Sequence, residues 1–259
     1  MSAHSDTFVS VAGCRTHVLR GGKGPPLLFL HGASGGGRWL PFMEQLSQRF
    51  DVIAPEHPGF GASDDPPWLD RIDDLAYFYL DLMQALDLEG VHLVGTSLGG
   101  WLAAELAIRS TARLQTLTLV CAVGLLANGR PIDDIMRLPP EEHARRFCAD
   151  EAGARERLEQ LKAADPHVLA RNRATVVRLA WRPRFYNPDL GKWLHRIDKP
   201  TLLLWGDRDR LVPVEFGHAY AALVPGARLE VLANAGHAPY IDQGRAFVAA
   251  IERFIDHAR

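Results

Sequence analysis

Short apolar runs alternate along the chain with longer stretches in which apolar residues recur at helical spacing. The run 27–30 is fully apolar, as expected of a strand buried on both faces of a sheet. In the stretch 70–86, apolar side chains recur every three or four positions, which predicts an amphipathic helix. Strands and helices that alternate in this way predict a mostly parallel sheet covered by helices on both faces.

The same patterns predict the other elements of the fold. Strands are expected at 7–11, 16–20, 27–30, 52–54, 91–94, 114–120, 201–205 and 228–232, and helices at 39–46, 70–86, 98–109, 214–223 and 245–258. The first two strands are joined by a short turn and form an antiparallel hairpin at one edge. The fold class is therefore α/β, with an eight-stranded, mostly parallel sheet flanked by helices.

Residues 124–196 interrupt this alternation because they contain no convincing strand. Their apolar residues follow helical spacing, so we interpret the segment as a helical cap inserted between two strands of the sheet. This divides the chain into a core of 1–123 and 197–259 and a cap of 124–196. Arginines crowd the range 137–184, but acidic residues are interleaved with them. We therefore expect these arginines to form a solvated helical face.

Composition and charge exclude several classes of partner. The chain has 259 residues, of which 47% are hydrophobic and 23% charged, and its formal net charge is −2. Nucleic acids and anionic membranes both favour a basic surface, so neither is an expected partner. No segment approaches eighteen apolar residues, and the N-terminus lacks the pattern of a signal peptide. The expected location is the cytoplasm, and the oligomeric state stays open.

Neither the cysteines nor the glycine-rich turns indicate a cofactor. Cys14, Cys121 and Cys148 form no pair with metal-ligand spacing, and Cys121 ends an apolar run as a small core residue would. The glycines at 35–37 are not followed by the Gly-Lys-Ser/Thr of a phosphate loop, and no His-Glu-x-x-His motif is present. We expect neither a cofactor nor a metal.

The sequence Gly95-Thr96-Ser97-Leu98-Gly99 lies where a buried strand meets a helix. This is the context that a Gly-x-Ser-x-Gly nucleophile elbow requires. Small residues on either side allow the sharp turn, which raises the serine hydroxyl above the sheet and points a helix N-terminus at it. Ser97 is therefore the candidate nucleophile.

A serine hydroxyl needs a base to take its proton. His237 lies in a loop after the last predicted strand, where such a base is expected. The loop after the preceding strand offers two candidate acids, Asp207 and Asp209. The oxyanion requires two backbone donors, for which Leu98 at the start of the helix and Ala33 in the turn 31–37 are the candidates.

Taken together, these motifs resemble the α/β-hydrolase superfamily over essentially the full length of the chain. Four signatures follow the family's order: His31-Gly32, the segment 58–63, the Ser97 elbow, and the two loops that carry the acid and the base. In relatives the acid loop reads Gly-x-x-Asp-x-x-x-Pro, and that register implies Asp209 as the acid. The resemblance also implies a Ser97–His237–Asp209 triad, a helical cap and no cofactor.

Several branches of the superfamily fit less well. Ser97 disfavours the relatives that use an aspartate nucleophile, and Ala33 disfavours the haloperoxidases, which often carry an aromatic residue there. Carbon–carbon bond hydrolases of ring-cleavage products usually have asparagine before the serine and tryptophan after the histidine. Here these positions are Thr96 and Ala238. We therefore expect hydrolysis of a small-to-medium carboxylic ester.

Two alternatives remain: a carbon–carbon bond hydrolase acting on meta-cleavage dienoate products, and a non-catalytic ligand receptor on the same fold. Four residues are expected at the substrate pocket, namely His31, Trp181, Phe185 and Tyr186. The partner would be a small-molecule ester or a related carbonyl compound. Neither the physiological substrate, the enantioselectivity nor the mobility of the cap follows from the sequence.

Overall fold

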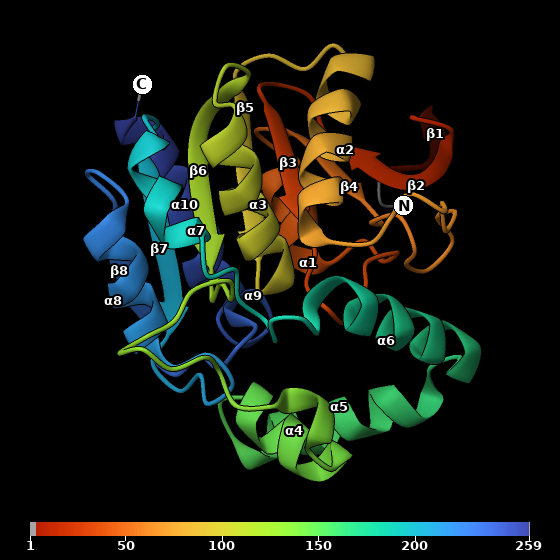
Figure 1. Cartoon of the computed structure of the whole chain (residues 1–259), viewed down its shortest axis with the longest axis vertical. Coiled ribbons are helices and arrows are strands. Elements are labelled where there is room, and N and C mark those ends of the chain that lie inside the picture. Colours follow the sequence, from red (N-terminus) through yellow and green to blue (C-terminus); the bar gives the residue numbers. More distant parts are fainter. Residues whose placement is uncertain (1–3, 259) are drawn as a thin grey trace.

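The computed structural model describes residues 4–258, and its centre is one eight-stranded sheet (Figure 1). The strands are β1 (His4–Val11), β2 (Cys14–Gly21), β3 (Pro26–Leu30), β4 (Asp51–Pro55), β5 (Val91–Thr96), β6 (Leu114–Val120), β7 (Thr201–Gly206) and β8 (Arg228–Leu232). Their order across the sheet is β1-β2-β4-β3-β5-β6-β7-β8. Only the pairs that involve β2 are antiparallel. The predicted α/β class, with eight strands and an antiparallel hairpin at one edge, is confirmed.

Helices cover both faces of this sheet. They are α1 (Pro41–Leu46), α2 (Ile72–Ala85), α3 (Leu98–Arg109), α8 (Val214–Leu223), α9 (Pro239–Asp242) and α10 (Gly244–His257). In Figure 1, α2 and α3 lie in front of the strands, whereas α1 and α10 lie behind them. Phe42 of α1 packs edge-on against Phe247 of α10, with ring centroids 5.4 Å apart.

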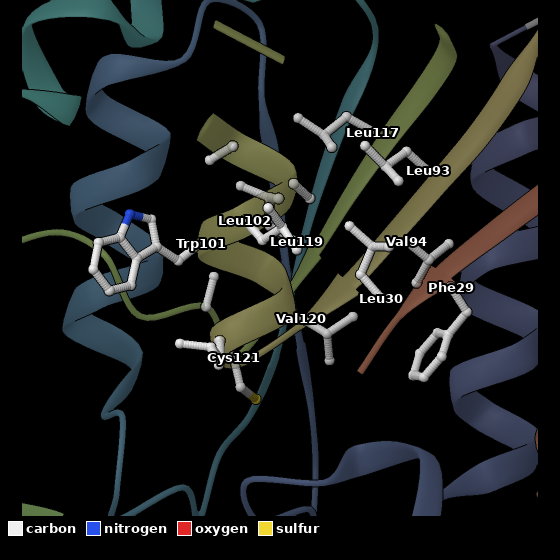
Figure 2. Packing of buried hydrophobic residues seen from close by; sticks show 14 of the residues in the cluster. Phe29, Leu30, Leu93, Val94, Trp101, Leu102, Leu117, Leu119, Val120 and Cys121 are labelled. Carbon is white, nitrogen blue, oxygen red and sulfur yellow. The ribbon is translucent and has the colours of Figure 1, made fainter. Parts of the chain in front are cut away.

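The central strands are buried on both faces because both are covered by helices. All six residues of β5 are buried, as are all six of β7. Figure 2 shows Leu30 of β3 and Leu119 of β6 on the side of the sheet that faces α3, whereas Val94 of β5 lies beside Phe29 on the other side. Since parallel strands align their carboxyl ends, the loops that follow β3, β5, β7 and β8 emerge at one edge of the sheet.

The segment between β6 and β7 is helical. It contains α4 (Pro140–Phe147), α5 (Glu151–Ala163), α6 (Pro166–Ala180) and α7 (Leu190–Trp193), with 3₁₀ turns at Ile135–Arg137 and Leu194–Arg196. Within the part of the chain that the structure describes, this segment forms isolated β-bridges but no strand. We call α4, α5 and α6 the inserted helices. The proposed division into two domains stays a prediction.

Two sequence-based expectations need correction. The helix expected from residue 39 begins at Pro41, whose ring suits the first helical turn. Trp39 instead stacks on His4, with ring centroids 4.8 Å apart. The arginines of 137–184 do not all form a solvated face, since Arg157 and Arg171 are half-buried and bond to core loops. No helix among residues 4–258 is long and apolar enough to cross a membrane.

The substitution Leu30→Ala tests how much the central sheet contributes to stability. Leu30 is fully buried at the end of β3, so the shorter side chain leaves a cavity and should lower the free energy of unfolding by about 2–5 kcal/mol. Leu223→Ala is the matched control, because Leu223 of α8 is 42% exposed. Urea unfolding followed by circular dichroism gives both values, and equal losses would contradict the proposed core.

Candidate active site

Ser97 occupies a strained turn between β5 and α3. Its backbone angles are φ +54° and ψ −114°, a combination that non-glycine residues rarely adopt. A side chain at Gly95 would overlap the carbonyl of Gly99, and one at Gly99 would overlap the carbonyl of Leu30. Thr96 and Leu98 are buried, whereas Ser97 is half-buried. The turn therefore exposes the hydroxyl of Ser97 at the carboxyl edge of the sheet, while the side chains on either side of it stay buried.

The three candidate catalytic side chains form one hydrogen-bonded chain. The hydroxyl of Ser97 donates to Nε2 of His237 at 2.9 Å. Nδ1–H of His237 donates to Oδ2 of Asp209 at 2.7 Å. The side chain of Asp209 is fully buried, and that of His237 is 6% exposed. This is the geometry in which an imidazole takes a proton from a serine while a carboxylate orients it.

The acid loop distinguishes the two candidate aspartates. The second oxygen of Asp209, Oδ1, accepts the amides of Leu211 and Val212, each at 2.9 Å. These two bonds fix the carboxylate so that Oδ2 faces the imidazole. Asp207 is exposed, and it accepts the amide of Ala235 at 3.2 Å. The structure therefore places Asp209 beside the base and gives Asp207 a role in holding the loop.

Close backbone packing brings the acid and base loops together. A side chain at Gly206 would overlap the carbonyls of Ala235 and Gly236. On its other side, Gly236 lies against the backbone of 147–149, and the amide of His237 donates to the carbonyl of Phe147 at 2.7 Å. The base is thus held between the sheet and the end of α4.

The turn after β3 lies directly against the elbow. A Cβ atom at Gly32 would be 3.2 Å from Cβ of Ser97, so the turn 31–37 passes next to the nucleophile. Among the described residues, the amides of Ala33 and Leu98 form none of the hydrogen bonds that occupy neighbouring loop amides. Two free backbone donors beside a serine hydroxyl suit an oxyanion hole.

Two buried imidazoles hold this turn in place. Nδ1–H of His31 donates to the carbonyl of Gly32 at 2.8 Å, and its Nε2 accepts the amide of His57 at 2.9 Å. Nε2–H of His57 donates to the carbonyl of His31 at 2.9 Å, while the hydroxyl of Tyr79 donates to Nδ1 at 2.6 Å. Burial lowers the pKa of His31 to about 4 and that of His57 well below its usual value. Both rings are therefore neutral in the folded protein.

A buried carboxylate, which the sequence did not single out, lies between two loops of the site. Oε2 of Glu56 accepts two hydrogen bonds, one from Nδ1–H of His17 at 2.9 Å and one from the amide of Ala62 at 2.9 Å. A side chain at Gly37 or Gly61 would clash with its carboxylate. Glu56 thus packs against the turn 31–37, which we call the oxyanion turn, and bonds to the segment 58–63. No local pattern marks such a residue, because its partners come from distant parts of the chain.

The inserted helices contact both sides of the triad. The ring of Phe147 in α4 lies edge-on to the imidazole of His237, with centroids 5.3 Å apart. Asn172 of α6 accepts the amide of Gly61 at 3.0 Å and donates to the carbonyl of Ser34 at 3.3 Å. In Figure 1, α4, α5 and α6 lie together below the sheet, and the contact of Phe147 with His237 brings the end of α4 against the core as well. The sequence predicted the helices but not these contacts.

The four residues expected at the substrate pocket are not gathered in one place. Trp181 and Tyr186 line a pocket of about 480 Å³ together with Pro131 and Ile132. Phe185 is only 3% exposed and does not line that pocket. Both ring nitrogens of His31 are occupied by backbone groups, so it can offer a ligand only the edge or face of its ring. Pocket roles for these residues stay predictions.

Cys121 lies beneath the triad, and its sulfur is within 4.8 Å of ligand-type atoms of Asp209 and His237. These are metal-ligating residue types, but the carboxylate and the imidazole already bond to each other and to Ser97. Burial raises the pKa of the Cys121 thiol well above its usual value, which keeps it protonated. The residues therefore fit a proton relay better than a metal site.

Comparison with known proteins gives consistent matches. The model of the alpha/beta hydrolase family matches residues 27–250. The chain is 31% identical to a pimeloyl-[acyl-carrier protein] methyl ester esterase of Methylococcus capsulatus, over 90% of this chain and 96% of that protein. It is 28% identical to a 2-hydroxy-6-oxo-2,4-heptadienoate hydrolase of Pseudomonas putida, over 98% of both chains. Among solved structures, a bacterial membrane phospholipase A superposes with a TM-score of 0.84 at 26% identity, covering 100% of this chain and 87% of that one.

The neutral imidazoles predict a loss of stability in acid. The pKa of His31 is about 4 in the folded chain and near 6.5 in the unfolded chain, so the unfolded state binds the extra proton first. The stabilisation linked to the neutral imidazole is therefore fully present above pH 6.5. As the pH drops from 6.5 to 4, the free energy of unfolding should fall by on the order of 1–3 kcal/mol. Urea unfolding at a series of pH values measures this slope.

The variant His31→Gln isolates this contribution. Its amide oxygen can accept the amide of His57 but does not titrate, so its stability should fall less steeply than that of the wild type over the same pH interval. His218→Gln, at an exposed position on α8, is the matched control and should keep the wild-type slope. Identical slopes for all three proteins would refute the assignment.

Proposed function

We propose that this chain, which belongs to the alpha/beta hydrolase family, is a serine hydrolase that cleaves small-to-medium carboxylic esters through an acyl-enzyme on Ser97. The observation that carries the proposal is the hydrogen-bonded chain from Ser97 through His237 to Asp209, with distances of 2.9 Å and 2.7 Å. An exposed serine alone would be a poor nucleophile at neutral pH. This arrangement supplies a base in contact with the hydroxyl and an acid that fixes the base's tautomer.

The reaction follows from this geometry. Ser97 attacks the ester carbonyl while Nε2 of His237 takes its proton, and the buried carboxylate of Asp209 stabilises the resulting imidazolium. The amides of Ala33 and Leu98 would hold the oxyanion, and losing such a donor typically costs about 2.7–4 kcal/mol. His237 then protonates the leaving alkoxide. Water attacks the acyl-enzyme in the same way and releases the acid.

Relatives support both the ester and the carbon–carbon reaction. The Methylococcus capsulatus relative is an esterase by name, and the Pseudomonas putida relative is a dienoate hydrolase. We place ester hydrolysis first because this chain has Thr96 and Ala238 at positions where ring-cleavage hydrolases usually carry asparagine and tryptophan. Carbon–carbon bond hydrolysis of a meta-cleavage dienoate is the second candidate, since the similarity to such an enzyme covers nearly the whole chain.

The variant Ser97→Ala tests the nucleophile. Hydrolysis of 4-nitrophenyl butyrate should fall by at least about a thousandfold, because no other group in the proposed relay can form the acyl-enzyme. Labelling by a fluorophosphonate should disappear in the variant, while its circular dichroism spectrum stays that of the wild type. Unchanged turnover would overturn the assignment.

A substrate panel in the same assay separates the candidate functions. Turnover of ring-cleavage dienoates with little turnover of simple esters would favour the carbon–carbon reaction. Wild-type protein that neither hydrolyses any panel member nor labels with the probe would favour a ligand receptor.

The variants Asp209→Asn and Asp207→Asn test the acid. In Asp209→Asn the amide oxygen should remain on the amides of Leu211 and Val212, which turns the NH₂ group toward Nδ1 of His237. The imidazole then carries its proton on Nε2 and cannot accept one from the serine. We expect kcat to fall by about ten-thousandfold. Asp207→Asn should lose less than tenfold, and the reverse order would reassign the acid.

A further inference from the structure

Arg157 of α5 reaches from the inserted helices toward the candidate active site. Its Nη2 donates to the hydroxyl of Ser34 at 3.0 Å, and its guanidinium carbon lies 3.6 Å from the centroid of the Phe147 ring. The Nε atom is buried and has no hydrogen-bond partner among the described residues. One polar edge of this guanidinium is therefore held in place but left unsatisfied.

This arginine lacks the counter-charge that its neighbours have. Four arginines of the inserted segment bond to a carboxylate, in the pairs Arg145–Glu151, Arg146–Glu142, Arg178–Asp65 and Arg184–Asp134. Three others bond to backbone carbonyls instead, namely Arg171, Arg173 and Arg196. Within residues 4–258, Arg157 forms no ion pair, and the nearby charge of Arg38 repels it. Burial and this repulsion lower the pKa of Arg157 below its usual value, though a guanidinium stays charged at neutral pH. Removing a cation from water without a carboxylate beside it is costly, and a hydrogen bond to Ser34 and the face of Phe147 offset only part of that cost.

Arg157 contacts residues next to both the candidate oxyanion donor and the candidate base. Ser34 directly follows Ala33, the proposed oxyanion donor. Phe147, on which the guanidinium lies, contacts the imidazole of His237. The charged group thus lies between the oxyanion turn and the base. His143 stacks on the same phenyl ring, and burial together with Arg157 lowers its pKa to about 4, so its ring is neutral at pH 7.

We propose that Arg157 binds a carboxylate carried by the substrate, so that the preferred esters are half-esters of short dicarboxylic acids. This inference rests on the proposed function, because it names the substrate class of the same site. Ser34 and Phe147 hold the guanidinium in one orientation. Its Nη1 forms no hydrogen bond among the described residues and, unlike Nε, is not enclosed, so it can donate to a carboxylate. A substrate anion would also relieve the repulsion between Arg157 and Arg38.

A pair of esters that differ in charge tests the proposal. Mono-4-nitrophenyl glutarate carries a carboxylate, whereas 4-nitrophenyl butyrate does not. The wild type should prefer the charged ester. In Arg157→Met, the ratio of kcat/KM for the charged ester to that for the neutral ester should fall by about tenfold to hundredfold, mainly through KM. Arg157→Lys should restore part of the ratio because it keeps the charge but loses the planar fork.

The matched control is Arg155→Met, at an exposed position on the same helix, which should keep the wild-type ratio. Equal losses for both esters in Arg157→Met would assign this arginine a structural role and overturn the proposal. A wild type without preference for the charged ester would overturn it as well.

Binding without turnover separates this proposal from the proposed function. Isothermal titration of Ser97→Ala with monomethyl glutarate should give binding that the double variant Ser97→Ala/Arg157→Met weakens by at least about tenfold. Dimethyl glutarate should bind both proteins equally. If esters are not hydrolysed but this difference persists, the anion site stands and the hydrolase proposal fails. If esters are hydrolysed and the difference is absent, only the anion site fails.

Discussion

Direct backbone contact at the carboxyl edge of the sheet is the constraint on which the rest of the site depends. The start of α3 lies against the end of β3 with no side chain between them, because a Cβ atom at Gly99 would overlap the carbonyls of Leu30 and His31. The end of β7 meets the base loop at Gly206 in the same way. These contacts bring the loops after β3, β5, β7 and β8 to one small region. Ser97 and His237, which are 140 residues apart in the sequence, then meet at 2.9 Å, and Asp209 bonds to the same imidazole at 2.7 Å.

The electrostatics of the site follow from burial. Asp209 is fully buried, but it accepts two backbone amides and the imidazole, so its charge is compensated without a neighbouring cation. His31 and His57 are buried after β3 and β4, and each has both ring nitrogens bonded while neutral. These two imidazoles therefore position the turn 31–37 without adding a positive charge beside Ser97.

The inserted helices supply side chains that contact the candidate active site from outside the sheet. Phe147 packs on the base, Asn172 bonds to the oxyanion turn, and Arg157 brings a charge that no carboxylate of the described residues neutralises. In the proposed reaction the core loops carry the general chemistry, so differences in substrate among relatives with this fold are expected in such insertions. The similarity of this chain to both an ester hydrolase and a dienoate hydrolase agrees with that view.

The sequence by itself determined the α/β class and the eight strands, because these depend on local periodicity, and the strand–turn–helix context pointed to Ser97 as the candidate nucleophile. It left Asp207 and Asp209 both open as partners of His237, and only the resemblance to the family's loop register favoured Asp209. The elements α3 and α8 begin and end where the pattern predicts. The roles of Glu56, Phe147 and Arg157 were decided only by the tertiary structure, since each depends on partners from distant segments. The arginines of 137–184 look alike in sequence, but packing leaves Arg145 exposed and encloses the Nε of Arg157. Local pattern specifies what a segment forms, whereas burial and charge pairing depend on what the fold places beside it.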